Sequence, residues 1–518
     1  RSLTFHACHG PMRQVEVLHD HLLRRFDEDP TLQPRDVVVM TPDIEVYAPL
    51  IEAVFSEGRR GGADPGFPLL PFHVADRGLR SQNPVAEAVA RVLALPETRM
   101  TASEVLDLLA LEPVRRRFGL AEDDLPAIRR WVDESGIRWG IDADDRARHG
   151  QPAADANTWR FGLDRLLLGY AMPGEDRTFG GVLPFDAVEG GPARTLGRFA
   201  DACETLFAQV RALAAPRSLA DWRATLDDLL ADLVRTAPGD AWRVRQVQDL
   251  GRRIADEAGD AFGGAVTLDA YRAILEEGFG TAGAGTGFLG GAVTFCAMVP
   301  LRAIPFRVVC LLGLDDGRFP RQRDRLAFDR MAGRPQPGDR TPRDDDNYMF
   351  LEALISARDS LAVFFTGQHI ADNKELPPAV PVAELLDVVD ATFATDSGRP
   401  ARDLLLRRHA LQPFSPRNFQ PGDPFSYDGR FLEGAKRLLG VRGTPPALFA
   451  GLLDDPVTAR ADGGPEPLGV GLDALIRFVQ NPVEFLLKER LGLRLEPAAA
   501  DLRDREPIEL APLEAYRV

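Results

Sequence analysis

Two short groups of polar residues in this sequence have side chains suited to metal-dependent chemistry. His6, Cys8 and His9 carry imidazole and thiol groups that bind transition metals, although so short a segment brings only two of them together easily. The alternative is a polar loop after a strand. Residues Asp372-Asn-Lys374 have the Asp-x-Lys spacing of a nuclease metal site, with Asp43 as the formal acidic partner. Three-residue matches recur by chance, so neither group establishes a metal site.

Two other segments resemble phosphate-binding loops. Residues 278–283 match Gly-x-Gly-x-x-Gly, which binds a dinucleotide when a strand precedes it and a helix follows. Here the order is reversed, so we predict a flexible return crossing out of a helical region. Asp315 and Asp316 follow an apolar run, as in the Mg²⁺-binding strand of P-loop enzymes. None of the three lysines follows a glycine, so the Gly-Lys phosphate loop is absent and the acids are expected to cap a loop.

The composition is that of a globular protein without a basic charge field. The 518 residues are 45% hydrophobic, and 62 basic against 78 acidic residues give a net charge of −16. A polyanion would therefore bind at local groups of positive charge. The four cysteines lie far apart, no apolar run approaches the ~18 residues of a membrane span, and no signal peptide opens the chain. We expect a cytoplasmic protein that does not enter a membrane and, from its first and last residues, a piece of a longer chain.

Hydrophobic periodicity predicts a sheet domain that is interrupted and then resumed. Apolar runs typical of buried parallel strands occur at 3–6, 36–40, 293–298, 308–312 and 361–365. The helices predicted beside them begin near residue 14 and cover 47–55 and 344–357. The fold class is therefore α/β.

The intervening residues, about 83–278, form an α-helical insertion by the same criterion. Asn83 before Pro84, and Thr101 with Glu104, are typical of helix N-termini. Later helices are predicted over 196–213, 219–234, 242–258 and 268–277. Residues from about 395 to 465 are rich in Pro, Gly and Arg and are predicted as a partly irregular connector, and a further helical pattern begins at Leu472.

Two longer stretches carry more specific information. Residues 293–320 resemble motif V and the following strand of UvrD-like superfamily-one helicases, and residues 343–361 fall where motif VI should be. This resemblance implies a RecA-like fold for the sheet domain. The apolar frame is kept, but in motif V this chain has Val299 for the His, Arg302-Ala303 for the Lys-Gly and Pro305 for the Glu. In motif VI, Ser356 stands at the arginine finger.

These substitutions remove groups that ATP hydrolysis requires. An arginine finger stabilises charge on the transferring phosphoryl and contributes ~10³ or more in rate. Pro305 has no carboxylate with which to hold a ribose, and Ser356 has no positive charge. We therefore expect a RecA-like half without ATPase activity or a bound cofactor, in which Arg302 still faces a phosphate backbone.

Further blocks extend the resemblance over nearly the whole chain. Together with the changes in motifs V and VI, they closely resemble the RecC family, the gamma subunits of exodeoxyribonuclease V (RecBCD); the blocks are residues 6–20, 38–44, 131–142, 158–163, 169–172 and 338–340. The resemblance runs to about residue 495 and covers only the middle of a RecC chain. The N-terminal half and most of the C-terminal domain fall outside it.

The resemblance implies a role that the residues alone do not indicate. Members of the family are catalytically inactive relatives of helicases that bind RecB and RecD. They split incoming duplex DNA, channel the two single strands and scan the 3′-ended strand for Chi. One acidic contact of the family maps to Asp339, whose carboxylate could accept from a cytosine amino group or orient an arginine. The alternative is a loop Asp that pairs with Arg340 or caps the helix at Asp344. Arg340 and Arg343 could hold phosphates.

The expected organisation follows from both lines of argument. An inactive RecA-like core covers 1–68 and 285–395, the helical insertion 69–284, the connector 396–464, and the start of an inactive nuclease-like domain 465–518. Asn481 stands where AddB-type relatives carry a cluster-ligating Cys, so no iron–sulfur ligand is expected there. Two alternatives stay open: an ATP-hydrolysing helicase subunit with its Walker loop upstream, and a purely architectural scaffold.

Overall fold

A computed structural model describes the chain over the ranges 2–56, 69–172, 177–185, 192–259, 262–281, 290–298, 304–322, 329, 336–396, 398–420, 426–440, 443, 471–493 and 502–506. The chain divides into two compact units. The first unit comprises residues 1–93 and 213–440, and the second comprises residues 94–212 and 441–518.

The first unit contains a parallel β-sheet. Among the described residues its order is β3-β4-β2-β5-β6-β1-β7, and every pairing is parallel. The strands are β1 (Leu3–Cys8), β2 (Val37–Thr41), β3 (Phe72–Val74), β4 (Val293–Ala297), β5 (Phe306–Leu312), β6 (Ala357–Thr366) and β7 (Leu406–Arg408). The central strands are apolar at successive positions because both faces of the sheet are covered.

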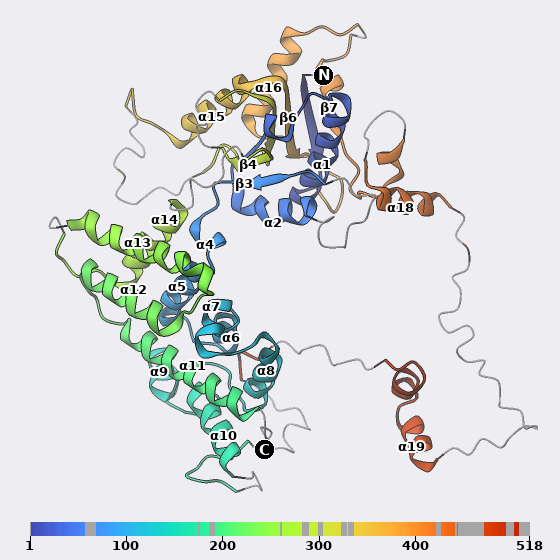
Figure 1. Cartoon of the computed structure of the whole chain (residues 1–518). Coiled ribbons are helices and arrows are strands. Elements are labelled where there is room, and N and C mark those ends of the chain that lie inside the picture. Colours follow the sequence, from blue (N-terminus) through green and yellow to red (C-terminus); the bar gives the residue numbers. More distant parts are fainter. Residues whose placement is uncertain are drawn as a thin grey trace, which may run out of the picture. The chain divides into compact units, whose positions relative to one another are not determined.

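Helices cover the two faces of this sheet (Figure 1). Val37 and Val39 of β2 point into a core shared with α1 (Pro11–Glu28) and α2 (Ile44–Phe55). Val38 and Met40 point into a second core with α15 (Pro342–Ser356) and α16 (Val380–Thr392). This alternation along one strand confirms the predicted α/β class with a buried parallel sheet.

Helices form most of the remaining described structure. In the first unit they are α4 (Leu79–Gln82), α5 (Pro84–Ala94), α12 (Leu219–Leu233), α13 (Ala241–Ala258), α14 (Leu268–Thr281), α17 (Arg402–Leu405) and α18 (Gly429–Leu439). In the second unit they are α6 (Ala102–Leu109), α7 (Glu112–Phe118), α8 (Leu125–Glu134), α9 (Ala143–Arg148), α10 (Trp159–Ala171), α11 (Ala193–Ala212), α19 (Leu472–Gln480) and α20 (Pro482–Phe485), the last followed by a π-helical turn (Leu486–Arg490).

The predicted helix caps are confirmed. Asn83 Oδ1 accepts from Val85 N at 2.9 Å, and Thr101 with Glu104 forms a reciprocal capping box. Asn481 caps α20 by accepting from Glu484 N.

Three segments differ from the expectation. The predicted flexible crossing at residue 278 is wrong over its described part, because α14 continues to Thr281 and the bare Cα of Gly278 allows close contact with Leu250 of α13. β1 extends beyond the predicted strand 3–6 to Cys8, so Cys8 belongs to the strand rather than to a polar loop after it. Residues 406–408, expected in the connector, form β7, which pairs with β1.

The four cysteines are free and buried. Within the described ranges, no helix combines the length and the apolar character that crossing a membrane requires.

Candidate functional site

Asp339, Arg340 and Arg343 lie together in a short loop and in the first turn of α15. Asp339 N donates to Gln336 O at 3.0 Å, and Gln336 N donates to Asp339 Oδ2 at 2.7 Å, so the carboxylate stabilises a tight turn. Gly338 has a φ of +99°, which favours glycine at this position. Asp339 therefore neither pairs with Arg340 nor caps the helix.

Helix α15 begins with its own cap. Thr341 Oγ1 accepts from Asp344 N at 3.1 Å. Arg340 is 83% exposed and pairs with Asp345 at 3.0 Å, a surface ion pair that stabilises little and exchanges readily. Arg343 is exposed and has no ion pair with any described residue. The guanidinium groups of Arg340 and Arg343, close to Asp339 in the chain, are therefore exposed to solvent.

An ion pair with a buried carboxylate holds this end of α15 in place. Asp346 is 2% exposed and accepts from both the backbone N–H and the guanidinium of Arg321, at 2.6 Å in each case. A doubly bonded Arg–carboxylate pair of this kind fixes orientation as well as distance. The ion pair thus fixes the helix end that follows the exposed loop.

Pro305 and Ser356 lie side by side at the amino edge of the sheet. Phe306 of β5 is in register with Ala357 of β6, so the residues that precede them are neighbours. Pro305 is exposed, whereas Ser356 is 8% exposed and donates its hydroxyl to Ala353 O at 2.8 Å. Arg302 lies outside the described residues.

The carboxyl edge of the sheet is filled by a buried polar network. Gln14 of α1, fully buried, donates to Asp315 Oδ1 at 3.2 Å and to Thr366 Oγ1 at 2.9 Å. Its oxygen accepts from Gly313 N and from the Tyr47 hydroxyl. Open α/β sheets usually bind ligands at this edge, but here the protein's own side chains occupy it.

The acidic residues noted in the sequence have structural roles. Asp315 is 8% exposed and also accepts from Thr366 N at 2.6 Å, which confirms the predicted role of an acid that closes a loop after a strand. Asp43 caps α2 by accepting from Glu45 N and Val46 N. Asp372 accepts from Lys374 N in an exposed turn. Among the described residues, no group of three or more His, Cys, Asp or Glu side chains is arranged to hold a metal ion.

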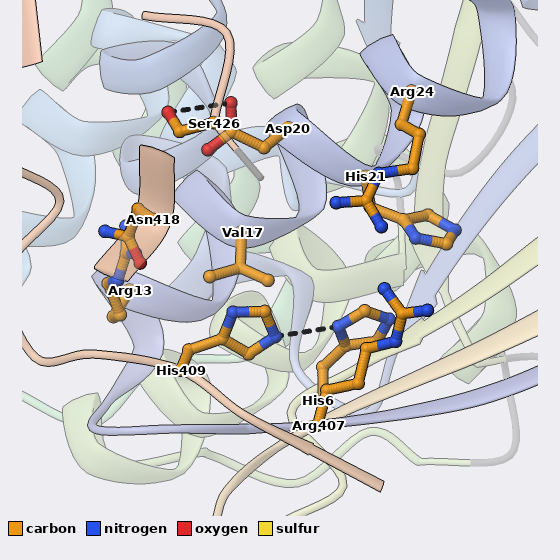
Figure 2. Close-up of a pocket in the computed structure, with 10 residues that line it drawn as sticks. All are labelled: His6, Arg13, Val17, Asp20, His21, Arg24, Arg407, His409, Asn418 and Ser426. Atoms are coloured by element: carbon orange, nitrogen blue, oxygen red, sulfur yellow. Dashed lines mark hydrogen bonds between the residues drawn. The ribbon is translucent and has the colours of Figure 1, made fainter. Parts of the chain in front are cut away.

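A small cavity lies where α1, β1 and the segment after β7 meet (Figure 2). His6 Nδ1 is 2.9 Å from His409 Nε2, and the His6 ring stacks on Phe364. Asp20 Oδ1 accepts from Tyr427 N at 2.9 Å and from the Ser426 hydroxyl at 3.2 Å. The complete lining is His6, Arg13, Val17, Asp20, His21, Arg24, Arg407, His409, Asn418 and Ser426.

Burial controls the charges of this cavity. Desolvation lowers the pKa of His21 to about 3 and also lowers the pKa values of His6 and His409, so the three imidazoles are neutral at pH 7. Desolvation raises the pKa of Asp20 to about 6, against the opposing effect of its hydrogen bonds. Around this cavity His409 bonds to His6 of β1, whereas Ser426 and Tyr427 bond to the Asp20 carboxylate of α1.

Sequence reasoning missed both buried polar groups. Asp315 lies 301 residues from Gln14 along the chain and His409 lies 403 residues from His6, so no local pattern indicates these pairs. His6 stood out only as a possible metal ligand, and its ring instead meets a second neutral histidine.

The chain matches models and members of a known protein family. The model of the RecBCD enzyme subunit RecC fourth domain matches residues 82–283, and that of the RecC C-terminal domain matches residues 467–518. The whole chain aligns with the RecBCD enzyme subunit RecC of Escherichia coli (strain K12) at 39% identity, of Mycobacterium tuberculosis (strain H37Rv) at 38% and of Haemophilus influenzae (strain Rd) at 34%. The chain belongs to the RecC family. It spans 45%, 46% and 44% of the length of these three RecC relatives, respectively.

Proposed function

We propose that this chain is the central and C-terminal part of a subunit that handles DNA in a RecBCD-type helicase–nuclease during recombinational repair of double-strand breaks. The observation that carries the proposal is the end-to-end similarity of the chain to proteins named RecBCD enzyme subunit RecC. The partners expected are RecB-like and RecD-like subunits in the cytoplasm, together with double-stranded and single-stranded DNA. The subunit would split duplex ends, channel the strands and recognise Chi without chemistry of its own.

We further infer that the sheet domain is a RecA-like core, of the UvrD type, that no longer hydrolyses ATP. The neighbouring places of Pro305 and Ser356 support this, because a helicase of that type would set its ribose-binding Glu and its arginine finger there. Pro305 has no carboxylate, and the Ser356 hydroxyl is bonded to Ala353 O. A working helicase with its Walker loop upstream would need another arginine to act as the finger in place of Ser356 at the amino edge of the sheet.

The proposed domain pattern keeps the boundaries expected from the sequence. The core comprises 1–68 and 285–395, the insertion 69–284, the connector 396–464, and an inactive nuclease-like domain starts at 465. Because β7 pairs with β1, the connector would contribute one strand to the core.

The loop at 336–343 is the proposed DNA contact, with Asp339 as the Chi-reading carboxylate and Arg340 and Arg343 as phosphate ligands. Arg302, elsewhere in the chain, is a further proposed phosphate ligand. Asp339 Oδ2 is used in the turn, whereas its other oxygen has no hydrogen bond to any described residue. That oxygen is available to a base amino group. If the chain were a purely architectural scaffold, this second oxygen of Asp339 would have no role in binding.

Substitution at Asp339 in the reconstituted complex tests this assignment. Asp339→Asn keeps an acceptor for Gln336 N but removes the charge, whereas Asp339→Ala removes both. We expect both variants to weaken the response to Chi and to leave the unwinding rate unchanged, with the exposed Asp403→Asn as the matched control. A defect in Asp339→Ala alone would assign the residue to the turn, and a normal response in both would remove it from the Chi site.

A further inference from the structure

The second unit contains three hydrogen-bond donors that converge on one short segment of the chain. The donors are the backbone N–H of Ser103, the indole N–H of Trp139 and the guanidinium of Arg146. Their acceptors are carboxylates of Asp504 and Glu506. Residues 82–283 and 467–518 match different family domains, so these contacts join two separate regions of the chain.

The contact at Ser103 completes the N-terminus of α6. The first N–H groups of a helix have no partner within it and must find acceptors outside. Here Ala102 N donates to Arg138 O and Glu104 N donates to Thr101 Oγ1. Ser103 N donates to Asp504 Oδ1 at 2.9 Å, so a carboxylate from about 400 residues away satisfies this group. A carboxylate at this end also interacts favourably with the helix dipole.

The contact at Glu506 neutralises a buried cation. The side chain of Arg146 is 9% exposed and lies over the Trp139 ring, with Cζ 4.4 Å from the ring centroid. Glu506 Oε1 accepts from Arg146 Nη2, and Oε2 accepts from Trp139 Nε1 at 3.1 Å. Among the described residues, no other carboxylate forms an ion pair with Arg146. A buried guanidinium without an acceptor is costly, so an anionic partner is favoured at Arg146.

In a third contact the cation belongs to the C-terminal segment and the carboxylate to the helical region. Arg503 donates through Nε and Nη2 to the two oxygens of Asp133, at 3.0 and 3.2 Å. The surface therefore presents one carboxylate and then two groups of donors, and the segment presents Arg503, Asp504 and Glu506 in the complementary order. This pattern selects a peptide of defined charge sequence rather than any anion.

We propose that Ser103, Asp133, Trp139 and Arg146 form a peptide-docking site whose occupant is the chain's own segment Arg503–Glu506. Docking fastens the C-terminal region to the helical region of the second unit. The inference is independent of the proposed role in DNA handling.

Glu506→Gln in the full chain tests the docking most sharply. A glutamine offers one oxygen where two donors point, so either Trp139 or Arg146 loses its acceptor. The segment contains two trypsin sites, after Arg503 and after Arg505. We expect cleavage there to be faster by about tenfold or more, the factor that corresponds to one charge-assisted hydrogen bond. Trp139 should also become more accessible to fluorescence quenchers.

Glu484→Gln is the matched control, because Glu484 is an exposed carboxylate of the same region that pairs with Lys488. It should leave cleavage at Arg503 and Arg505 unchanged. Asp504→Ala provides a second and separate readout, since hydrogen exchange of the Ser103 amide should be faster by about tenfold or more. Wild-type rates of cleavage in Glu506→Gln together with wild-type exchange at Ser103 in Asp504→Ala would overturn the proposal.

Discussion

The carboxyl edge of the sheet and the loop before α15 use polar side chains in opposite ways. At the sheet edge Gln14 is fully buried and forms four hydrogen bonds to groups from three other elements of the chain. In the loop, Arg340 is 83% exposed and its partner is five residues away. The usual ligand edge of an α/β sheet is therefore closed by the protein itself, whereas charges that could meet DNA stand on an exposed loop.

Because of this difference, the buried network mainly affects folding stability and the exposed loop mainly affects binding. A buried polar network fixes the packing of α1 and α2 on the sheet, and its loss leaves unsatisfied groups in the interior. Exposed charges contribute little to stability but act on a charged partner through solvent. Substitutions in the two regions should therefore change different measurements.

The largest effect is expected for Gln14→Leu. The variant leaves the buried Tyr47 hydroxyl without its acceptor and Asp315 without one donor, so the free energy of unfolding of the sheet domain should fall by about 2–4 kcal/mol. Urea unfolding followed by hydrogen exchange in β5 and β6 measures this loss. Gln420→Leu, at an exposed position, should change it by less than about 0.5 kcal/mol. Equal stabilities of the two variants would mean that the network does not hold the edge closed.

A smaller and pH-dependent effect is expected for Asp20→Asn. Burial raises the pKa of Asp20 to about 6, so the folded protein loses stability relative to a non-titrating side chain as pH rises from about 4 to 6. The variant should be more stable than the wild type by roughly 1–2 kcal/mol at pH 7.5, and the difference should vanish below pH 4.

Thermal melting of the two proteins at pH 7.5 and pH 4 checks this prediction. The cavity histidines are present in both proteins, so their own loss of stability in acid cancels in the difference. A variant that is less stable at pH 7.5 would mean that the Asp20 carboxylate stabilises segment 426–428 as an ion.

The smallest change in stability, and the clearest change in binding, is expected for Arg343→Ala. Loss of one phosphate contact should reduce the slope of log affinity against log salt concentration by about 0.9 for duplex DNA. The folded stability should stay within about 0.5 kcal/mol of the wild type. Arg358→Ala, which removes another exposed arginine, serves as the control. If both variants retain the wild-type slope, the loop does not contact the DNA backbone.

Local patterns in the sequence were sufficient to predict the central strands and the helices that cover them. β2, β4 and β5 follow apolar runs, and the caps at Asn83 and Thr101 follow from side chains within three residues. β7 was missed because its three residues, Leu-Arg-Arg, carry no strand pattern and are ordered only by pairing with β1.

The candidate sites likewise divide into those built from chain neighbours and those built from residues far apart in the sequence. Asp339, Arg340 and Arg343 lie together because they are neighbours in the chain. Gln14 meets Asp315, His6 meets His409 and Glu506 meets Arg146 across hundreds of residues, and only the folded chain brings these partners together. The GxGxxG segment was misjudged because Gly278 permits close packing of two helices, which a pattern of glycines does not distinguish from a flexible crossing.

The loss of ATPase activity can be measured as ATP hydrolysis by the full-length gene product, alone and with single-stranded DNA and Mg²⁺. Pro305 and Ser356 at the amino edge of the sheet supply neither a carboxylate nor a cation, so we expect no turnover above background, with or without DNA. DNA-stimulated turnover that persists through repurification would contradict it and would identify the chain as part of a working motor.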